Sequence, residues 1–174
     1  MTRSELEHIL RASAAITGAD QFVVIGSQAI LGQFPDAPAP LTTSKEADVF
    51  SLRSTGDTEL IDGSIGEESP FHRTFGYYAH GVGEETATLP AGWKDRLVPI
   101  HGPNTGSATG LCLEVHDLAV SKLVAGREKD TEFVGALLRH RLADRATIRA
   151  RLTATALDAA QRSACEARLG RIPG

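Results

Sequence analysis

The chain has 174 residues, of which 41% are hydrophobic, and a formal net charge of −4 at pH 7. A chain of this length can bury a substantial core without disulfides or a structural metal. It contains no run of about 20 apolar residues and no basic segment leading into an apolar one, so neither membrane spanning nor secretion is indicated. We therefore expect a cytoplasmic protein with no membrane partner.

The acidic net charge argues against extensive coating of nucleic acid, because phosphate binding needs clustered Lys and Arg side chains. DNA is not expected as a partner. Positive charge is nonetheless concentrated in the C-terminal half, in Lys122, Arg127, Lys129, Arg139, Arg141, Arg145, Arg149 and Arg151. These side chains could hold a polyanion locally, or they could form the solvated faces of helices.

Hydrophobic periodicity predicts an amphipathic helix from about Ser4 to Thr17, followed by a strand at Gln21–Ile25. A short helix is expected from Ser27 to about Gln33. The proline-rich stretch 34–40 then excludes regular structure, and a second strand is expected from about Glu46 to Leu52.

The second half of the chain is predicted to continue with a helix at Asp57–Ile65, short strands with a loop in the aromatic stretch Phe71–His80, paired strands at Arg96–Ile100 and Leu111–Val115, a helix at Leu118–Ala125, and two or three further helices between Asp130 and Leu169. Breaks between the last helices are expected near His140-Arg141 and Thr153–Thr155. This order predicts an α+β fold, in which helices flank a mixed sheet and a helical tail follows.

Two motifs in the first half carry chemistry. The first strand runs into Gly26-Ser27, where the glycine allows close approach of a ligand and the serine, with the first N–H groups of its helix, could grip a phosphate. Glu46 and Asp48 fall on one face of the next strand, because strand side chains alternate with period two, and paired carboxylates can hold Mg²⁺. Together they indicate Mg²⁺-dependent handling of nucleoside triphosphates. The alternatives are an ordinary Ser helix cap and charged residues that protect an edge strand.

A third motif lies in the second half. Lys122 interrupts an otherwise apolar helix stripe, so its cation should face a site or extend outward to solvent. A triphosphate would be a suitable partner for it, and a surface lysine is the alternative. Asp130 ends the charged run that begins at Arg127, and its simplest explanation is an N-cap for a helix starting at Thr131.

These motifs resemble those of the nucleotidyltransferase superfamily related to polymerase β, whose signature is hydrophobic-Gly-Ser, a spacer, and Asp/Glu-x-Asp/Glu on the following strand. The segment DLAVSKLVAGREKD at 117–130 is similar to the D-L-x-x-x-K-L-x-A-x-R-x-K-D block of the AbiEii and MenT toxin-type branch. The two blocks span about 22–138 and suggest a small stand-alone subfamily. The resemblance implies a single nucleotidyltransferase-like domain over 1–174, with a core at about 20–138 and C-terminal helices at about 139–170.

The resemblance also implies roles for the residues of the first two motifs. Nucleotidyl transfer requires one or two Mg²⁺ ions, about 3.5–4 Å apart where there are two, to neutralise developing charge. Glu46 and Asp48 would be their ligands and catalytic residues. Gly26 and Ser27 would bind the nucleotide phosphates. Glu46 stands where Asp is commoner, which leaves one or two metals open, and the long spacer could make Pro35–Thr43 a loop over the nucleotide or an insertion.

In the related block, the lysine serves the triphosphate and a late aspartate orients that lysine or positions the acceptor. The resemblance therefore implies catalytic roles for Lys122 and Asp130, with Lys122 and Arg127 contacting the nucleotide. Glu114 is the rival for a third acidic position, because the superfamily often places that carboxylate on a central strand and Leu111–Val115 is predicted to be one.

The first functional hypothesis is an enzyme that transfers a nucleotide from an NTP to an acceptor hydroxyl. The resemblance implies RNA as the acceptor, with the tRNA 3′ end as the precedent, in a toxin–antitoxin or phage-defence setting with a cognate antitoxin or toxin protein as partner. The alternatives are an antitoxin-type enzyme that adds AMP to a protein, and a catalytically degenerate domain that binds a nucleotide or a partner.

Overall fold

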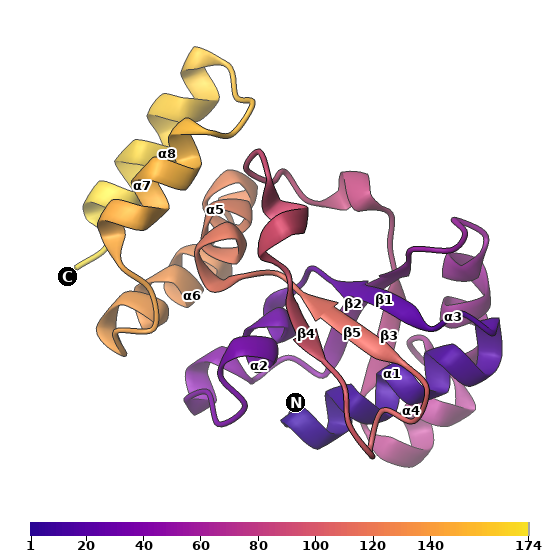
Figure 1. The fold of residues 1–174 in the computed structure, drawn as a ribbon. Helices are drawn as coiled ribbons and strands as arrows, with labels where there is room; N and C mark the ends of the chain where they lie inside the picture. The colour runs from indigo at the N-terminus through magenta and orange to yellow at the C-terminus, as the bar shows by residue number, and fades with distance from the viewer. Residues whose placement is uncertain (174) are drawn as a thin grey trace.

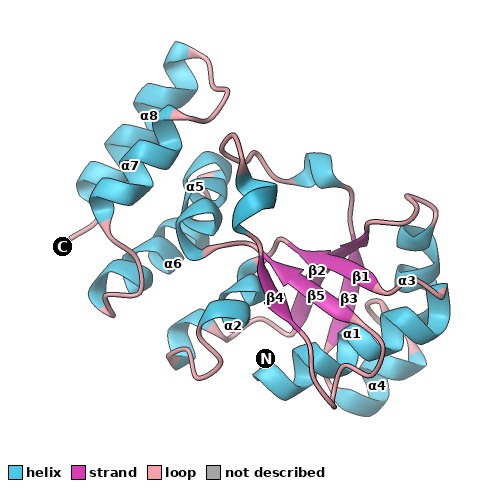
Figure 2. Ribbon diagram, viewed as in Figure 1, coloured by secondary structure: helices cyan, strands magenta, loops and turns pink. Residues whose placement is uncertain are grey.

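The computed structural model describes residues 1–173 and contains a five-stranded sheet with the spatial order β3-β2-β1-β5-β4 (Figures 1 and 2). The strands are β1 (Gln21–Val24), β2 (Glu46–Ser51), β3 (Tyr78–Gly81), β4 (Val98–Ile100) and β5 (Thr109–Cys112). β1 is antiparallel to β2 and parallel to β5, whereas β2 is parallel to β3 and β4 is antiparallel to β5. The sheet is therefore mixed and open, which confirms the predicted α+β class.

Helices flank this sheet and form the C-terminal part. They are α1 (Arg3–Thr17), α2 (Ile30–Gln33), α3 (Asp57–Ile65), α4 (Pro70–Phe75), α5 (Val115–Ala125), α6 (Glu128–Arg139), α7 (Arg145–Thr153) and α8 (Ala159–Arg171). Four single 3₁₀ turns connect them: η1 (Ser27–Ala29), η2 (Ala39–Leu41), η3 (Glu84–Thr86) and η4 (Trp93–Arg96). None of the helices within residues 1–173 has both the length and the apolar character needed to cross a bilayer.

The first four helices cover one face of the sheet. Strand register places Cys112, Val24, Val49 and Gly81 in one row, so they share a face. Cys112 lies against α2, and a Cβ on Gly81 would stand 2.4 Å from the carbonyl oxygen of Thr58 in α3. α1 packs on α3 and β5, and α4 packs on α3 and β3. Side chains of the opposite parity on β2 therefore point to the other face.

The C-terminal helices form a second group, in which α5 packs against α6, α7 and α8 (Figure 1). A buried carboxylate, Asp117 of α5, helps to hold this group in place. Arg96 of η4 donates two hydrogen bonds to it, at 2.8 and 3.1 Å, and the Nε atom of Arg151 in α7 lies 3.4 Å away. The segment before β4 is thus tied to α5 and α7, which fixes α5 relative to the sheet.

The aromatic stretch folds differently from the prediction of short strands with a loop. Ser69 accepts a hydrogen bond from the His72 backbone, Pro70 occupies the first helical position, and Gly76 ends α4 with φ of 77°. Only Tyr78–Gly81 forms a strand. The capping residues before and after the stretch are helix signals, and they outweigh its aromatic composition.

The strand predicted at Leu111–Val115 is also displaced, since β5 ends at Cys112 and α5 begins at Val115. Glu114 is the N-cap of α5: its carboxylate accepts from the His116 backbone at 3.1 Å and contacts the His116 ring at 2.7 Å. The expectation that Glu114 lies on a central strand is therefore wrong. The helices after Asp130 do break where predicted, since α6 ends at Arg139 and α7 ends at Thr153.

Candidate functional site

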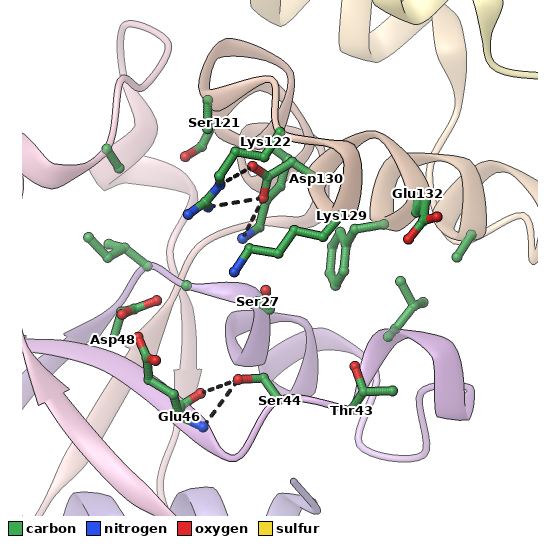
Figure 3. A pocket seen from close by; sticks show the side chains of 18 of the residues that line it. Ser27, Thr43, Ser44, Glu46, Asp48, Ser121, Lys122, Lys129, Asp130 and Glu132 are labelled. Atoms are coloured by element: carbon green, nitrogen blue, oxygen red, sulfur yellow. Dashed lines mark hydrogen bonds and ion pairs between the residues drawn. The ribbon is translucent and has the colours of Figure 1, made fainter. Parts of the chain in front are cut away.

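The acidic pair lies on the open face of the sheet. Glu46 and Asp48 are two residues apart on β2, and β2 lies between β1 and β3, so the explanation that they protect an edge strand is wrong. Both side chains are partly exposed, and Figure 3 shows them on one side of a cleft. Two acceptor-only groups are thus presented to the same space.

β3 adds two side chains that sequence reasoning did not place in the site. The parallel register sets Tyr78 opposite Glu46 and His80 opposite Asp48. His80 Nδ1 lies 3.1 Å from Glu46 Oε1 and 3.1 Å from Asp48 Oδ1, and the Tyr78 hydroxyl donates to Glu46 Oε2 at 3.1 Å. Ligand atoms of Glu46, Asp48 and His80 all lie within 4.8 Å of one another. These three side chains could hold a metal ion.

The electrostatics of the cluster favour a cation. Burial, together with the adjacent Glu46, raises the pKa of Asp48 to about 6. Burial would also raise the pKa of Glu46, but hydrogen bonds with Asp48, Tyr78 and His80 bring it below its ordinary value. The two carboxylates are too close to ionise independently, and a divalent cation would allow both to do so. The hard oxygen donors therefore fit Mg²⁺.

Gly26 makes room for this arrangement. The Ile25 N–H donates to the Asp48 carbonyl at 3.1 Å, which brings the end of β1 against β2. A Cβ on Gly26 would lie 1.8 Å from Asp48 Oδ2, so no side chain fits there without moving the carboxylate. Gly26, not Ser27, is the N-cap of η1. Ser27 is the first residue of the turn and lines the cleft between its two charged walls (Figure 3).

Cations line the opposite wall. Lys122 of α5 is not a surface lysine: its side chain is 12% exposed, and its Nζ lies 3.4 Å from Asp130 Oδ1 and 5.6 Å from the centroid of the Phe133 ring. Burial lowers the pKa of Lys122, and Asp130 opposes this effect. Arg127, just before α6, forms a two-point contact with Asp130, with its Nε and one terminal nitrogen at 2.6 and 3.2 Å.

Asp130 belongs to this cationic wall and not to the acidic side. It is the third residue of α6, whose N-cap is Arg127, so the explanation that Asp130 caps a helix starting at Thr131 is wrong. The residue is 1% exposed. Burial would raise the pKa of Asp130, but Arg127 and Lys122 bring it below its ordinary value. Its oxygens are therefore engaged in holding Lys122 and Arg127.

The two walls enclose a cleft of about 870 Å³, a size that suits a nucleotide. Gly26, Ser27, Glu46, Asp48, Lys122, Arg127 and Asp130, all predicted site residues, line it, together with His80, Lys129 and Arg139. Pro40, Leu41, Phe133 and Ala136 give it an apolar part. The end of the proline-rich loop thus forms part of the cleft wall, whereas Glu114 does not line it.

Comparison with known protein families assigns this chain to a family of nucleotidyltransferases. Residues 4–163 match the family described as nucleotidyltransferase of unknown function (DUF6036), and the chain belongs to that family. No curated protein and no solved structure gave a significant match. Membership supports the transferase class, and the narrower assignment to the AbiEii and MenT toxin-type branch stays a prediction.

The residues that sequence reasoning missed had a readable signal. Tyr78 and His80 alternate with period two, as Glu46 and Asp48 do. A strand at Tyr78–Gly81 that pairs in parallel with β2 places His80 beside an acid. Lys129 belongs to the basic region and to the 117–130 block, neither of which assigns it a role, and it lines the cleft because it lies in the first turn of α6.

The contact between Gly26 and Asp48 can be tested by Gly26→Ala. The added methyl group must displace the Asp48 carboxylate, so we expect Mg²⁺ or Mn²⁺ affinity, measured by calorimetry, to fall by about tenfold or more. Gly63→Ala is the matched control, because a Cβ there meets nothing within 4 Å. Equal metal affinity in both variants would show that Asp48 need not hold its position.

Asp48→Asn should stabilise the metal-free protein at pH 8 and not at pH 4. The folded-state pKa of Asp48 is raised to about 6. The contribution of the protonated carboxyl to folding stability is therefore complete below its unfolded-state pKa and is lost as the pH rises through about 6. Denaturation in EDTA should therefore show a gain of about 1–2 kcal/mol at pH 8. Asp36→Asn, a substitution at an exposed residue, should show no such gain. An equal gain for Asp48→Asn at both pH values would contradict the raised pKa of Asp48.

Proposed function

We propose that this chain is a Mg²⁺-dependent nucleotidyltransferase that transfers a nucleoside monophosphate from an NTP to an acceptor hydroxyl of RNA, the tRNA 3′ end, in a toxin–antitoxin or phage-defence setting. The observation that carries the proposal is the charge arrangement of the cleft. Glu46 and Asp48 face Lys122 and Arg127 across one cavity of about 870 Å³. A triphosphate with its divalent cation complements both walls at once.

Each wall has a distinct part in this reaction. Glu46 and Asp48 would hold Mg²⁺, which when bound neutralises charge on the phosphates. Lys122 would donate to the triphosphate oxygens, with Arg127 beside it, and Asp130 would hold both cations in place through its ion pairs. The Ser27 hydroxyl would contact a terminal phosphate. The chain thus binds and orients the reactants so that the acceptor hydroxyl can attack the α-phosphorus in line, which forms the new phosphodiester bond and releases pyrophosphate.

The apolar part of the cleft suits the rest of the nucleotide. Leu41 and Phe133 are buried residues whose atoms reach the cavity, and Ala136 lies one helical turn after Phe133. A base and ribose could rest against this surface while the triphosphate extends toward Lys122. Such a placement supports a nucleoside triphosphate over inorganic triphosphate as the ligand.

The basic residues around the cleft bear on the identity of the acceptor. Lys129, in the first turn of α6, and Arg139, the last residue of α6, both line the cleft, which supports a polyanionic acceptor. The other arginines are partly committed elsewhere. Arg145 donates to the Leu169 and Ile172 carbonyls, and Arg149 pairs with Glu166 at 3.5 Å.

This internal use of arginines favours a second candidate, transfer of AMP to a hydroxyl of a protein partner. A protein acceptor needs fewer cations around the cleft than RNA does, because it carries no repeated phosphate charge. The chemistry of the cleft walls would be the same in both cases. The two candidates therefore differ in the acceptor alone.

Incubation with each α-³²P-labelled NTP, Mg²⁺ and either total RNA or lysate protein tests the proposal. We expect label in an RNA band, and its loss by orders of magnitude in Asp48→Ala because a metal ligand is removed. Label in a protein band would favour the second candidate. Absence of label from every sample would contradict transferase activity and favour a degenerate nucleotide-binding domain.

Lys122→Ala should weaken NTP binding. Loss of a charge-assisted hydrogen bond in a partly buried site should lower NTP affinity by about 10- to 100-fold, measured by calorimetry with a non-hydrolysable analogue. Lys94→Ala is the control, since that exposed lysine pairs with Glu84 and neither residue lines the cleft. Equal affinity in the two variants would remove Lys122 from the nucleotide site.

A further inference from the structure

His80 differs from an ordinary surface histidine because it contacts both carboxylates of the acidic pair. It lies on β3 directly opposite Asp48, and its side chain is half exposed. Its Nδ1 is 3.1 Å from one oxygen of each carboxylate, Glu46 Oε1 and Asp48 Oδ1. One ring nitrogen therefore faces the acids, while half of the side chain remains exposed.

We propose that His80 is a third ligand of the divalent cation held by Glu46 and Asp48, and that its imidazole raises the affinity of the site for Mn²⁺ more than its affinity for Mg²⁺. The inference rests on the proposed function, because it concerns the cation of that same site. It goes beyond that function by naming a nitrogen donor and the metal preference that follows from it.

The types of donor atom in the site support this metal preference. Mg²⁺ strongly prefers oxygen ligands in near-ideal octahedral geometry, whereas imidazole nitrogen suits first-row transition ions. Mn²⁺ accepts carboxylates as readily as Mg²⁺ does. As a transition ion it also binds imidazole nitrogen more strongly than Mg²⁺ does, although it is the weakest binder of the first-row divalent series. One ligand atom from each of the three residues lies within 4.8 Å of the others, which is close enough for one ion to contact all three.

The strands hold these donors in place. Glu46 and Asp48 share a face of β2, and the parallel β2–β3 ladder brings His80 to the same face. Tyr78 donates to Glu46 Oε2, so it leaves Oε1, the oxygen nearest His80, available. Three ligands from two adjacent strands thus converge on one point beside the cleft.

A different role for His80 would be that of a protonated counter-ion to the two carboxylates, with no contact to the metal. The two roles predict opposite effects of removing the ring. If His80 is a ligand, its loss weakens Mn²⁺ binding. If it is a competing cation, its loss strengthens the binding of every divalent ion.

The experiment titrates Mn²⁺ alone into the metal-free full chain at pH 8 and follows it by electron paramagnetic resonance. We expect bound Mn²⁺ in the wild type to show magnetic coupling to a ¹⁴N nucleus, and His80→Ala to lose this coupling. Its Mn²⁺ affinity should fall by about tenfold or more, with a much smaller change for Mg²⁺ measured by competition. His140→Ala, an exposed histidine at the end of α6, should behave as the wild type.

His80→Asp provides a second variant, because it replaces the nitrogen with oxygen. We expect it to bind Mg²⁺ more tightly relative to Mn²⁺ than the wild type does. Coupling to ¹⁴N that persists in His80→Ala, or Mn²⁺ affinity that rises in it, would overturn the inference and leave the proposed function intact. A wild-type chain that binds neither ion would overturn the metal-dependent function itself.

Discussion

The register of β2 between β1 and β3 is the constraint on which the site depends. One face of β2 carries Ala47 and Val49 into the core, so Glu46 and Asp48 must point to the other face. β1 approaches Asp48 through a residue without a side chain, and β3 delivers His80 on the same face. A slip of one residue in this pairing would bury two carboxylates and dismantle the cleft.

The opposite wall depends on a carboxylate of a different kind. Asp130 is almost fully buried, and its oxygens hold Lys122 and Arg127. These three groups cannot neutralise one another completely, because two cations share one anion. The wall therefore retains positive charge toward the cleft, and that residual charge is what a triphosphate can use.

Much of this could be predicted from the sequence, because local patterns specify it. The period-two spacing of Glu46 and Asp48, the Gly-Ser turn and the break at His140 depend on neighbouring residues, and the structure has each of them. The place of Glu114 could not be predicted from the sequence, because an apolar run does not show where a strand ends and a helix cap begins. The role of His80 could not be predicted either, because it depends on pairing between strands that are more than 25 residues apart in the chain, and periodicity does not report such pairing.

The central claim is that the acidic pair and the cationic wall bind one nucleotide between them. A crystal structure with a non-hydrolysable NTP analogue and Mn²⁺ tests it most directly, because the metal is located by its anomalous scattering. The account predicts an anomalous peak in contact with Glu46 and Asp48 and a triphosphate that lies between Ser27 and Lys122. A nucleotide bound elsewhere, or a metal that contacts neither carboxylate, would contradict it.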